Sequence, residues 1–234
     1  MKARLVGLLG AALTVIAPVA AVAQDSAMPG TFTGNIAIVN DYVFRGITQT
    51  NQDPAVQGGL DWDSGAGVYV GTWASSLEFG NDAGMELDLY GGYRGAVDNF
   101  TYDVGFLYYM YPSTTAAGLD FWEVYGKAGY NFGPAAVTFG LNYTPDNTGA
   151  ANNDAGVYYS GVVSAPIGEM FSVSAGLGYS ALEGVQNYTD WNIGGTFNIP
   201  SWFSLDVRYY DTDYEAVCGT FCDERFVVKI SRAF

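Results

Sequence analysis

Residues 171–180 read Phe-Ser-Val-Ser-Ala-Gly-Leu-Gly-Tyr-Ser and alternate without error between two kinds of side chain. The odd-numbered positions are apolar or aromatic, whereas the even-numbered positions are serine or glycine. Successive side chains of a β-strand point to opposite faces, so the segment predicts a strand with one apolar face and one small polar face. The same period of two recurs through most of the chain.

Further segments repeat this alternation, and turn residues separate them. The pattern is clear in residues 99–111, where Phe, Tyr, Val and Met oppose Thr, Asp and Gly. In residues 67–77 both faces carry apolar or aromatic groups, so the pattern leaves open whether Tyr69 and Trp73 point outward. Twelve strands are expected, at residues 34–46, 55–63, 67–77, 85–94, 99–111, 121–132, 135–144, 156–165, 171–181, 188–199, 203–212 and 224–234.

The connections between these strands alternate in length. Every second connection is a tight turn, and the connections between them are longer and polar. Outer-membrane barrels have short periplasmic turns, longer extracellular loops and an even number of strands. The sequence therefore predicts an all-β fold, a transmembrane antiparallel up-and-down β-barrel of about 12 strands, with 10 or 14 strands or a soluble sandwich or solenoid as alternatives.

The N-terminal segment has the pattern of a secretory signal peptide. Lys2 and Arg4 precede an apolar stretch, and Ala21 and Ala23 form an A-x-A cleavage site. We therefore expect export to the bacterial outer membrane. The expected parts are a signal peptide at residues 1–23, a lead-in at 24–32 and a single barrel at 33–234.

The composition of the 234-residue chain excludes several classes of protein. It has no histidine, so serine-histidine hydrolysis and histidine-ligated metal sites are excluded. A net charge of -15, with 9 Lys and Arg against 24 Asp and Glu, disfavours nucleic acid. We expect no enzymatic activity, cofactor or metal, although Glu86 and Asp88 leave acid catalysis by paired carboxylates open.

The parity of the alternation assigns a set of polar residues to the barrel interior. In this set acidic side chains outnumber basic ones by eight to five. The expected pore-lining residues are Asp41, Arg45, Gln57, Asp61, Glu86, Asp88, Arg94, Asp103, Glu123, Lys127, Asp206, Arg208 and Lys229, and the same parity adds Asn142, Asp190 and Asn192.

These features predict a channel for passive diffusion of small hydrophilic solutes or ions. Rings of charge set selectivity in such channels, and the acidic excess predicts weak cation preference. Side chains fill the interior of a barrel of about eight strands, whereas a barrel of about sixteen strands has an aqueous channel, so twelve strands decide neither case. A structural or adhesive barrel that acts through acidic extracellular loops therefore stays the alternative. Nothing in the sequence indicates an interface between copies, so a monomer is the default.

A motif near the N-terminal end resembles a known family. Residues 40–49 read NDYVFRGITQ, and DPAVQGGL at residues 53–60 and GVYVGTWAS at residues 67–75 follow. This pattern resembles the TorF-like proteobacterial porin family, whose members are often called conserved proteins of unknown function. The resemblance implies an outer-membrane barrel without an agreed substrate.

On the expected first strand, Asp41 and Arg45 lie about 13 Å apart on one face, too far to pair. Each of these two charges then needs another partner. Gln57 and Asp61 on the second expected strand have the parity to supply one. Such contacts fit either a charge ladder that braces the wall or a lining of the permeation path.

The C-terminal segment ends in an aromatic residue. Phe226, Val228, Ile230 and Phe234 fall on one face of the final expected strand. This resembles the assembly signal of outer-membrane proteins and implies recognition by the barrel-assembly machinery, although Arg232 departs from the usual apolar character. The outward faces are expected to contact outer-membrane lipids.

Two further features concern the loops. Cys218 and Cys222 lie in the last long connection, and in an oxidising compartment they predict a local disulfide. Tyrosines at strand ends predict aromatic girdles at the membrane interface. The tyrosines concerned are Tyr108, Tyr109, Tyr111, Tyr158, Tyr159, Tyr209 and Tyr210.

Overall fold

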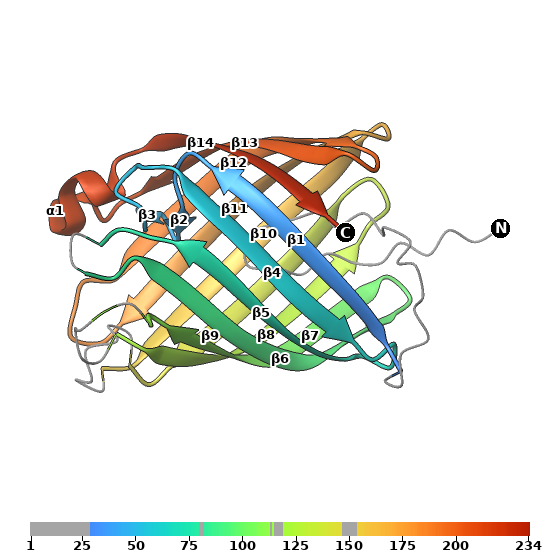
Figure 1. The fold of residues 1–234 in the computed structure, drawn as a ribbon, viewed down its shortest axis with the longest axis horizontal. Coiled ribbons are helices and arrows are strands. Elements are labelled where there is room, and N and C mark those ends of the chain that lie inside the picture. Colours follow the sequence, from blue (N-terminus) through green and yellow to red (C-terminus); the bar gives the residue numbers. More distant parts are fainter. Residues whose placement is uncertain (1–28, 80–81, 113, 115–118, 147–153) are drawn as a thin grey trace.

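The β-strands close into a single antiparallel barrel (Figure 1). A computed structural model describes residues 29–79, 82–112, 114, 119–146 and 154–234. Its barrel strands are β1 (Thr31–Val39), β4 (Ala55–Asp63), β5 (Val68–Ser76), β6 (Met85–Val97), β7 (Phe100–Met110), β8 (Phe121–Asn131), β9 (Ala136–Thr144), β10 (Gly156–Ile167), β11 (Phe171–Leu182), β12 (Tyr188–Ile199), β13 (Phe203–Thr212) and β14 (Arg225–Ala233). Each pairs with its neighbours in sequence, and β1 pairs with β14. The predicted twelve-stranded barrel is confirmed.

The two ends of the barrel differ in their connections. Tight turns join β4 to β5, β6 to β7, β8 to β9, β10 to β11 and β12 to β13, and we call their end the turn rim. The opposite end, the loop rim, carries the longer connections together with α1 (Glu215–Cys218) and the 3-10 helix η1 (Gly219–Cys222). The expected alternation of short and long connections is therefore present.

The outer wall of the barrel is apolar. Ile38 on β1, Leu177 on β11 and Phe139 on β9 expose 61%, 60% and 66% of their surfaces. On β5 the exposed apolar residues are Val68 and Val70, whereas Tyr69 and Trp73 point inward, so the ambiguous face is resolved. In the part of the chain that the structure describes, no helix has the length and apolar character needed to cross a membrane.

The inner wall is polar in the middle, and near the loop rim it combines buried polar groups with apolar ones. Small clusters of buried residues lie there, around Tyr109 and Tyr111, around Val39 and Val227, and around Tyr188. The girdle prediction is wrong for some of the tyrosines at strand ends, because their side chains point into the barrel. The tyrosines that point inward are Tyr109, Tyr111, Tyr158 and Tyr210.

The seam between β1 and β14 completes the barrel. Gly34 and Phe234 exchange two backbone hydrogen bonds, with N···O distances of 2.8 and 2.9 Å. The expected assembly-signal residues, three on β14 and one directly after it, lie on the outer face, and their role stays a prediction. These residues are Phe226, Val228, Ile230 and Phe234. The expected signal peptide, residues 1–23, lies outside the described residues.

Candidate functional site

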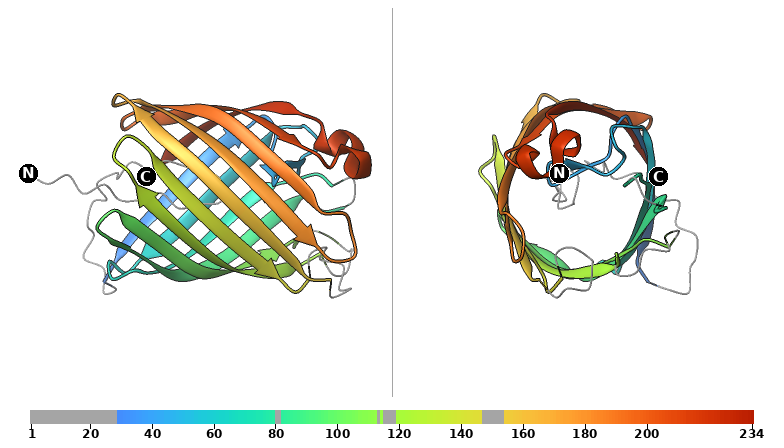
Figure 2. Two further views of the ribbon diagram at one scale, coloured as in Figure 1. Left: turned by 180° about the vertical axis from the view of Figure 1, so that it is seen from behind. Right: turned by 90° about the vertical axis from the view of Figure 1, so that its left-hand side faces the viewer.

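The connection between β1 and β4 folds into the barrel instead of extending from it. Two short strands, β2 (Val43–Phe44) and β3 (Ile47–Thr48), pair with each other, and we call residues 41–50 the inward hairpin. Its turn residues Arg45 and Gly46 both have positive φ, 49° and 82°. Two successive residues with positive φ define the type I′ turn that suits a tight β-hairpin. The hairpin lies within the barrel outline in the end-on view (Figure 2).

This geometry corrects the expected first strand, which extends from residue 34 to residue 46. β1 ends at Val39, and the Asn40 side chain then exchanges hydrogen bonds with the backbone of Phe226 and Val228 on β14. The expectation that Gln57 or Asp61 pairs with Asp41 or Arg45 is wrong. Gln57 donates to Ser75 and Asp61 accepts from Tyr90.

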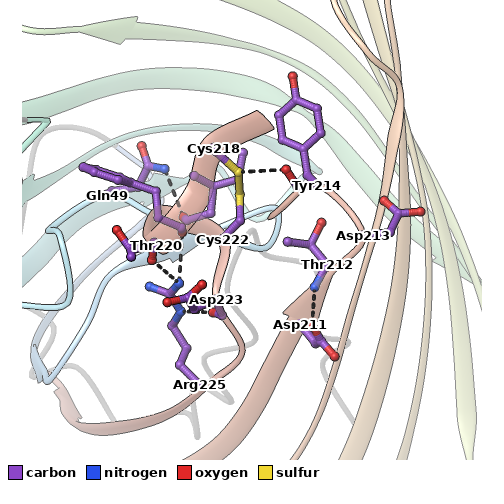
Figure 3. The surroundings of a disulfide bond; sticks show 12 residues. Gln49, Asp211, Thr212, Asp213, Tyr214, Cys218, Thr220, Cys222, Asp223 and Arg225 are labelled. Carbon is purple, nitrogen blue, oxygen red and sulfur yellow. Dashed lines mark hydrogen bonds between the residues drawn. A yellow bond between two sulfur atoms is a disulfide. The ribbon is translucent and has the colours of Figure 1, made fainter. Parts of the chain in front are cut away.

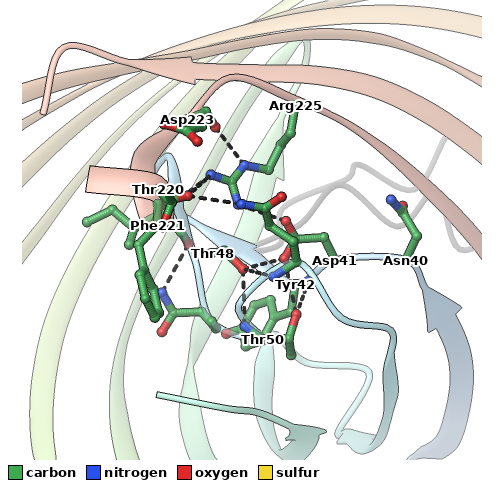
Figure 4. Close-up of polar contacts among 12 residues, drawn as sticks. Asn40, Asp41, Tyr42, Thr48, Thr50, Thr220, Phe221, Asp223 and Arg225 are labelled. Carbon is green, nitrogen blue, oxygen red and sulfur yellow. Dashed lines mark hydrogen bonds and ion pairs between the residues drawn. The ribbon is translucent and has the colours of Figure 1, made fainter. Parts of the chain in front are cut away.

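The base of the inward hairpin is held by Asp41, which is 3% exposed (Figure 4). Its carboxylate accepts hydrogen bonds from the hydroxyls of Thr48 and Thr50 and forms an ion pair with Arg225 of β14 at 2.9 Å. Arg225 also donates to the backbone carbonyls of Thr220 and Phe221. A buried charge kept by this many donors fixes the position of the hairpin relative to the wall.

The connection between β13 and β14 packs against the same base (Figure 3). Cys218 and Cys222 form a disulfide, as predicted, and Cys222 is fully buried beside Tyr188 and Tyr214. Gln52, just after the hairpin, donates to the carbonyl of Thr220. The disulfide therefore closes the segment whose backbone carbonyls accept hydrogen bonds from Arg225. Through this segment, the connection and the hairpin form one packed unit at the loop rim.

The tip of the inward hairpin reaches the opposite wall through Arg45. One guanidinium nitrogen of Arg45 lies 2.7 and 2.8 Å from the two carboxylate oxygens of Glu123 on β8. The guanidinium also stacks on the rings of Phe44 and Tyr158, at 4.6 and 4.3 Å from their centroids. Burial lowers the pKa of the Arg45 guanidinium, but the Glu123 carboxylate outweighs this effect and the pKa is raised.

Glu123 is also held from its own side of the barrel. It is 1% exposed and accepts hydrogen bonds from Tyr109 at 3.1 Å and Asn142 at 2.8 Å. Arg45 and Glu123 therefore connect the hairpin tip to strands that lie far from β1 around the barrel.

Gly46 allows the tip to approach the wall formed by β12 and β13. A Cβ atom at Gly46 would lie 2.8 Å from the Cβ of Asp190 and 3.0 Å from the Cβ of Thr212. Such distances leave no room for a methyl group, so the contact requires glycine as well as the positive φ.

We expect Gly46→Ala to destabilise the barrel by about 2 kcal/mol, because the substitution combines a steric clash with an unfavourable φ. Urea unfolding of the refolded protein measures the change. Gly168→Ala is the matched control, since Gly168 has φ 71° and a methyl group added there would meet no atom within 4 Å. Equal losses in the two variants would show that the tip does not press on the wall.

The flanks of the hairpin contact β5, β6 and β7. Tyr42 donates to Glu86 at 2.9 Å and packs edge-on against Trp73, with ring centroids 5.4 Å apart. Phe44 packs against Tyr109 at 6.0 Å. Burial raises the pKa of the Tyr42 hydroxyl well above its ordinary value, and Glu86 and Asp88 raise it further, so the hydroxyl keeps its proton.

Tyrosine hydroxyls recur as partners of inward carboxylates. Asp61 accepts from Tyr90 at 2.6 Å, and Asp103 accepts from Tyr69 at 2.5 Å. Asp190 accepts from Tyr158 at 3.2 Å. Glu86 and Glu123 also accept from tyrosines, as described above, so five inward carboxylates each accept a hydrogen bond from a tyrosine hydroxyl. Four of these five form no ion pair with any described residue, and Glu123 is the exception.

The other inward bases lie outside the hairpin. Arg208 of β13 pairs with Asp206 at 3.2 Å and donates to Ser174 and Asn192. Arg94 pairs with Asp63 at 2.6 Å near the turn rim, where both side chains are partly exposed. The remaining bases, Lys127 and Lys229, are half-buried on the inner wall, opposite Asp103 and Asp206 in register.

The structure places all the expected pore-lining residues inside the barrel, but in separate groups. Asp41 and Arg45 belong to the hairpin, whereas the others lie on barrel strands. The strand residues are Gln57, Asp61, Glu86, Asp88, Arg94, Asp103, Glu123, Lys127, Asp206, Arg208 and Lys229. The sequence did not identify Asp63, Arg225 and the tyrosine partners as members of the polar interior. Arg225 could have been found, because it lies four residues before Lys229 on the same strand and therefore points to the same side.

The chain belongs to a bacterial family without an assigned function. A family model described as "Bacterial protein of unknown function (Gcw_chp)" matches residues 23–234. No curated protein matches the chain in sequence. The narrower TorF-like designation stays a prediction.

Solved structures share the fold at low sequence identity. The KdgM porin is 9% identical, has a TM-score of 0.61, and the match covers 87% of this chain and 99% of that chain. The NanC porin is 11% identical, with a TM-score of 0.58 and coverage of 87% and 98%. The barrel therefore has the fold of porins.

Proposed function

We propose that this protein is an outer-membrane channel for passive diffusion of small hydrophilic solutes or ions, narrowed by the inward hairpin. The apolar outer wall suits a bilayer, and the polar inner wall suits a water path. The porin fold supports the same assignment. We further propose export by the N-terminal signal peptide, folding by the barrel-assembly machinery through the β14 signal, and a monomer surrounded by outer-membrane lipids.

The observation that carries a weak cation preference is the way the inward carboxylates are partnered. Arginines neutralise Asp41, Asp63, Glu123 and Asp206, whereas tyrosine hydroxyls hold Asp61, Glu86, Asp103 and Asp190. A hydroxyl stabilises a carboxylate without cancelling its charge. Lys127 lies opposite Asp103 in register, so Asp61, Glu86 and Asp190 are the tyrosine-held carboxylates that leave a negative potential in the lumen, which attracts cations and repels anions.

A planar bilayer with unequal potassium chloride on its two sides tests the channel and its preference together. We expect discrete current steps and a reversal potential whose sign corresponds to cation preference, weakening as salt screens the lumen. A reversal potential that favours chloride would contradict the cation preference. Absence of any current from correctly folded barrel would contradict the channel.

The alternative is a structural or adhesive barrel without an open path. The hairpin and the disulfide-closed connection both occupy the loop-rim end of the interior, which favours this alternative over a wide pore. We propose a non-enzymatic role in either case. The paired carboxylates Glu86 and Asp88 lack a histidine partner, because the sequence contains none.

A further inference from the structure

Asp88 on β6 occupies a particular position inside the barrel, between two aromatic residues. Its cross-strand neighbours in register are Trp73 on β5 and Tyr109 on β7. All three side chains point inward, and directly opposed side chains on neighbouring strands lie within contact distance. The Asp88 carboxylate is therefore flanked on both sides by aromatic rings.

Asp88 differs from the other inward carboxylates because neither of its oxygens accepts a hydrogen bond from the described residues, whereas Asp190, whose Oδ2 is also unpartnered, accepts from Tyr158 at Oδ1. Asp88 is 7% exposed, and its Oδ1 atom accepts no hydrogen bond among the described residues. Among the described residues, no arginine and no tyrosine hydroxyl donates to this oxygen. The carboxylates of Asp61, Glu86 and Glu123, in contrast, each accept from a tyrosine or an arginine. A desolvated carboxylate oxygen without a donor is costly, so this position favours arrival of a donor from outside the chain.

The inward hairpin adds further aromatic surface beside Asp88. Tyr42 packs against Trp73, and Phe44 packs against Tyr109. Trp73 and Tyr42 are only partly buried, so their exposed surface offers an approach from the lumen. Ring faces attract cations through the aromatic quadrupole, most strongly when the cation is partly desolvated and the ring is tryptophan.

We propose that Asp88, Trp73, Tyr42 and Tyr109 form a binding site for a small alkylammonium ion. The ammonium group donates to Oδ1 of Asp88, and the alkyl group lies against the rings. This inference rests on the proposed function, because the ion must reach the site through a water path. Carboxylate and aromatic surface together distinguish an organic ammonium ion from potassium, which is strongly hydrated and gains less from apolar contact.

Trp73 provides a direct readout of binding that does not require conductance. The other tryptophans lie on the outer face or in a turn, so a variant with Trp62, Trp122, Trp191 and Trp202 replaced by Phe reports on Trp73 alone. We expect n-butylammonium chloride to change the fluorescence of this refolded variant saturably. Potassium chloride at equal ionic strength and uncharged n-butanol serve as probes for charge alone and for apolar contact alone.

Asp88→Asn removes the charge and keeps the shape, and we expect it to weaken n-butylammonium affinity about tenfold. Asp103→Asn is the matched control, because it removes an inward charge held by Tyr69 elsewhere on the wall, and it should retain the affinity. Heat-dependent gel mobility verifies that each variant is folded. Unchanged affinity in Asp88→Asn, or an equal response to potassium or n-butanol, would overturn the proposal.

Bilayer recordings separate this inference from the proposed function. We expect n-butylammonium to reduce the potassium current of the parent barrel, and a roughly tenfold higher concentration to be needed for Asp88→Asn. Current that n-butylammonium leaves unchanged would overturn the site while leaving the channel intact. Folded barrel without current would overturn the channel, and the Trp73 titration would then still decide the site.

Discussion

Replacing residues 41–53 with Gly-Ser-Gly is expected to raise single-channel conductance about three- to tenfold, because the replacement removes the inward hairpin from the lumen. Val39 and Ala55 are paired in register, so a short connection can join β1 to β4 and keep their pairing, while Glu123 and Arg225 lose their ion-pair partners and the barrel loses stability. Asn40 stays in place and keeps its two hydrogen bonds to β14. Planar-bilayer recording of the refolded protein measures the step size.

The control for this replacement is a shortened connection between β11 and β12, at residues 183–187, which are exposed. That variant alters a connection of the loop rim without touching the hairpin, and its conductance should stay at the parent value. Equal step sizes in the parent and the hairpin-replaced barrel would mean that the narrowest part of the path lies elsewhere.

Arg45→Met is expected to destabilise the barrel by about 3 kcal/mol, because it leaves Glu123 buried without its cation. Glu123→Gln should cost a similar amount by leaving the Arg45 guanidinium unpaired. The double variant should recover much of either loss, since it removes both charges together. Urea unfolding of all four proteins in the same detergent gives the coupling energy.

Arg94→Met is the matched control for this cycle. Arg94 also pairs with a carboxylate and lies over a tyrosine ring, but its side chain and that of Asp63 are 42% and 31% exposed. Exposed ion pairs contribute less than about 1 kcal/mol, so this variant should change stability little. Additive losses in the Arg45 and Glu123 variants would show that their contact does not secure the hairpin.

The sequence was sufficient to predict the barrel walls. Alternation in segments such as residues 171–180 depends only on the two environments that a strand separates, and these are the same along each wall. It therefore identified the twelve strands and the inward parity of Glu86, Asp206 and Lys229. The alternation did not show which face of residues 67–77 points outward, because the inward Tyr69 and Trp73 are as large and apolar as their outward neighbours.

The inward hairpin was missed because its residues extend the alternation of β1 by several positions. Parity alone does not distinguish a strand that continues from one that ends and turns into the lumen. A local signal was present, since Arg45-Gly46 separates the pairs Val43-Phe44 and Ile47-Thr48 in the manner of a two-residue hairpin turn. Glycine at the second turn position was the indication of positive φ.

The tyrosine partners could not have been predicted from one sequence. Tyr69 lies far from Asp103 along the chain, and Tyr158 lies far from Asp190. Their contacts depend on strand register and on the reach of side chains over the one strand that lies between the two partner strands. The girdle prediction was wrong for Tyr109 and Tyr158 because a place near a strand end does not determine whether a side chain faces the membrane or the lumen.

The seam at Gly34 and Phe234 has a consequence for the order of folding. Almost the whole barrel sequence separates these two residues, so closure is the contact of greatest sequence separation and the slowest to find by diffusion. Until it forms, β1 and β14 each present an unpaired edge that invites pairing with other chains. Weakening the seam should therefore increase aggregation during refolding more than it alters the finished barrel.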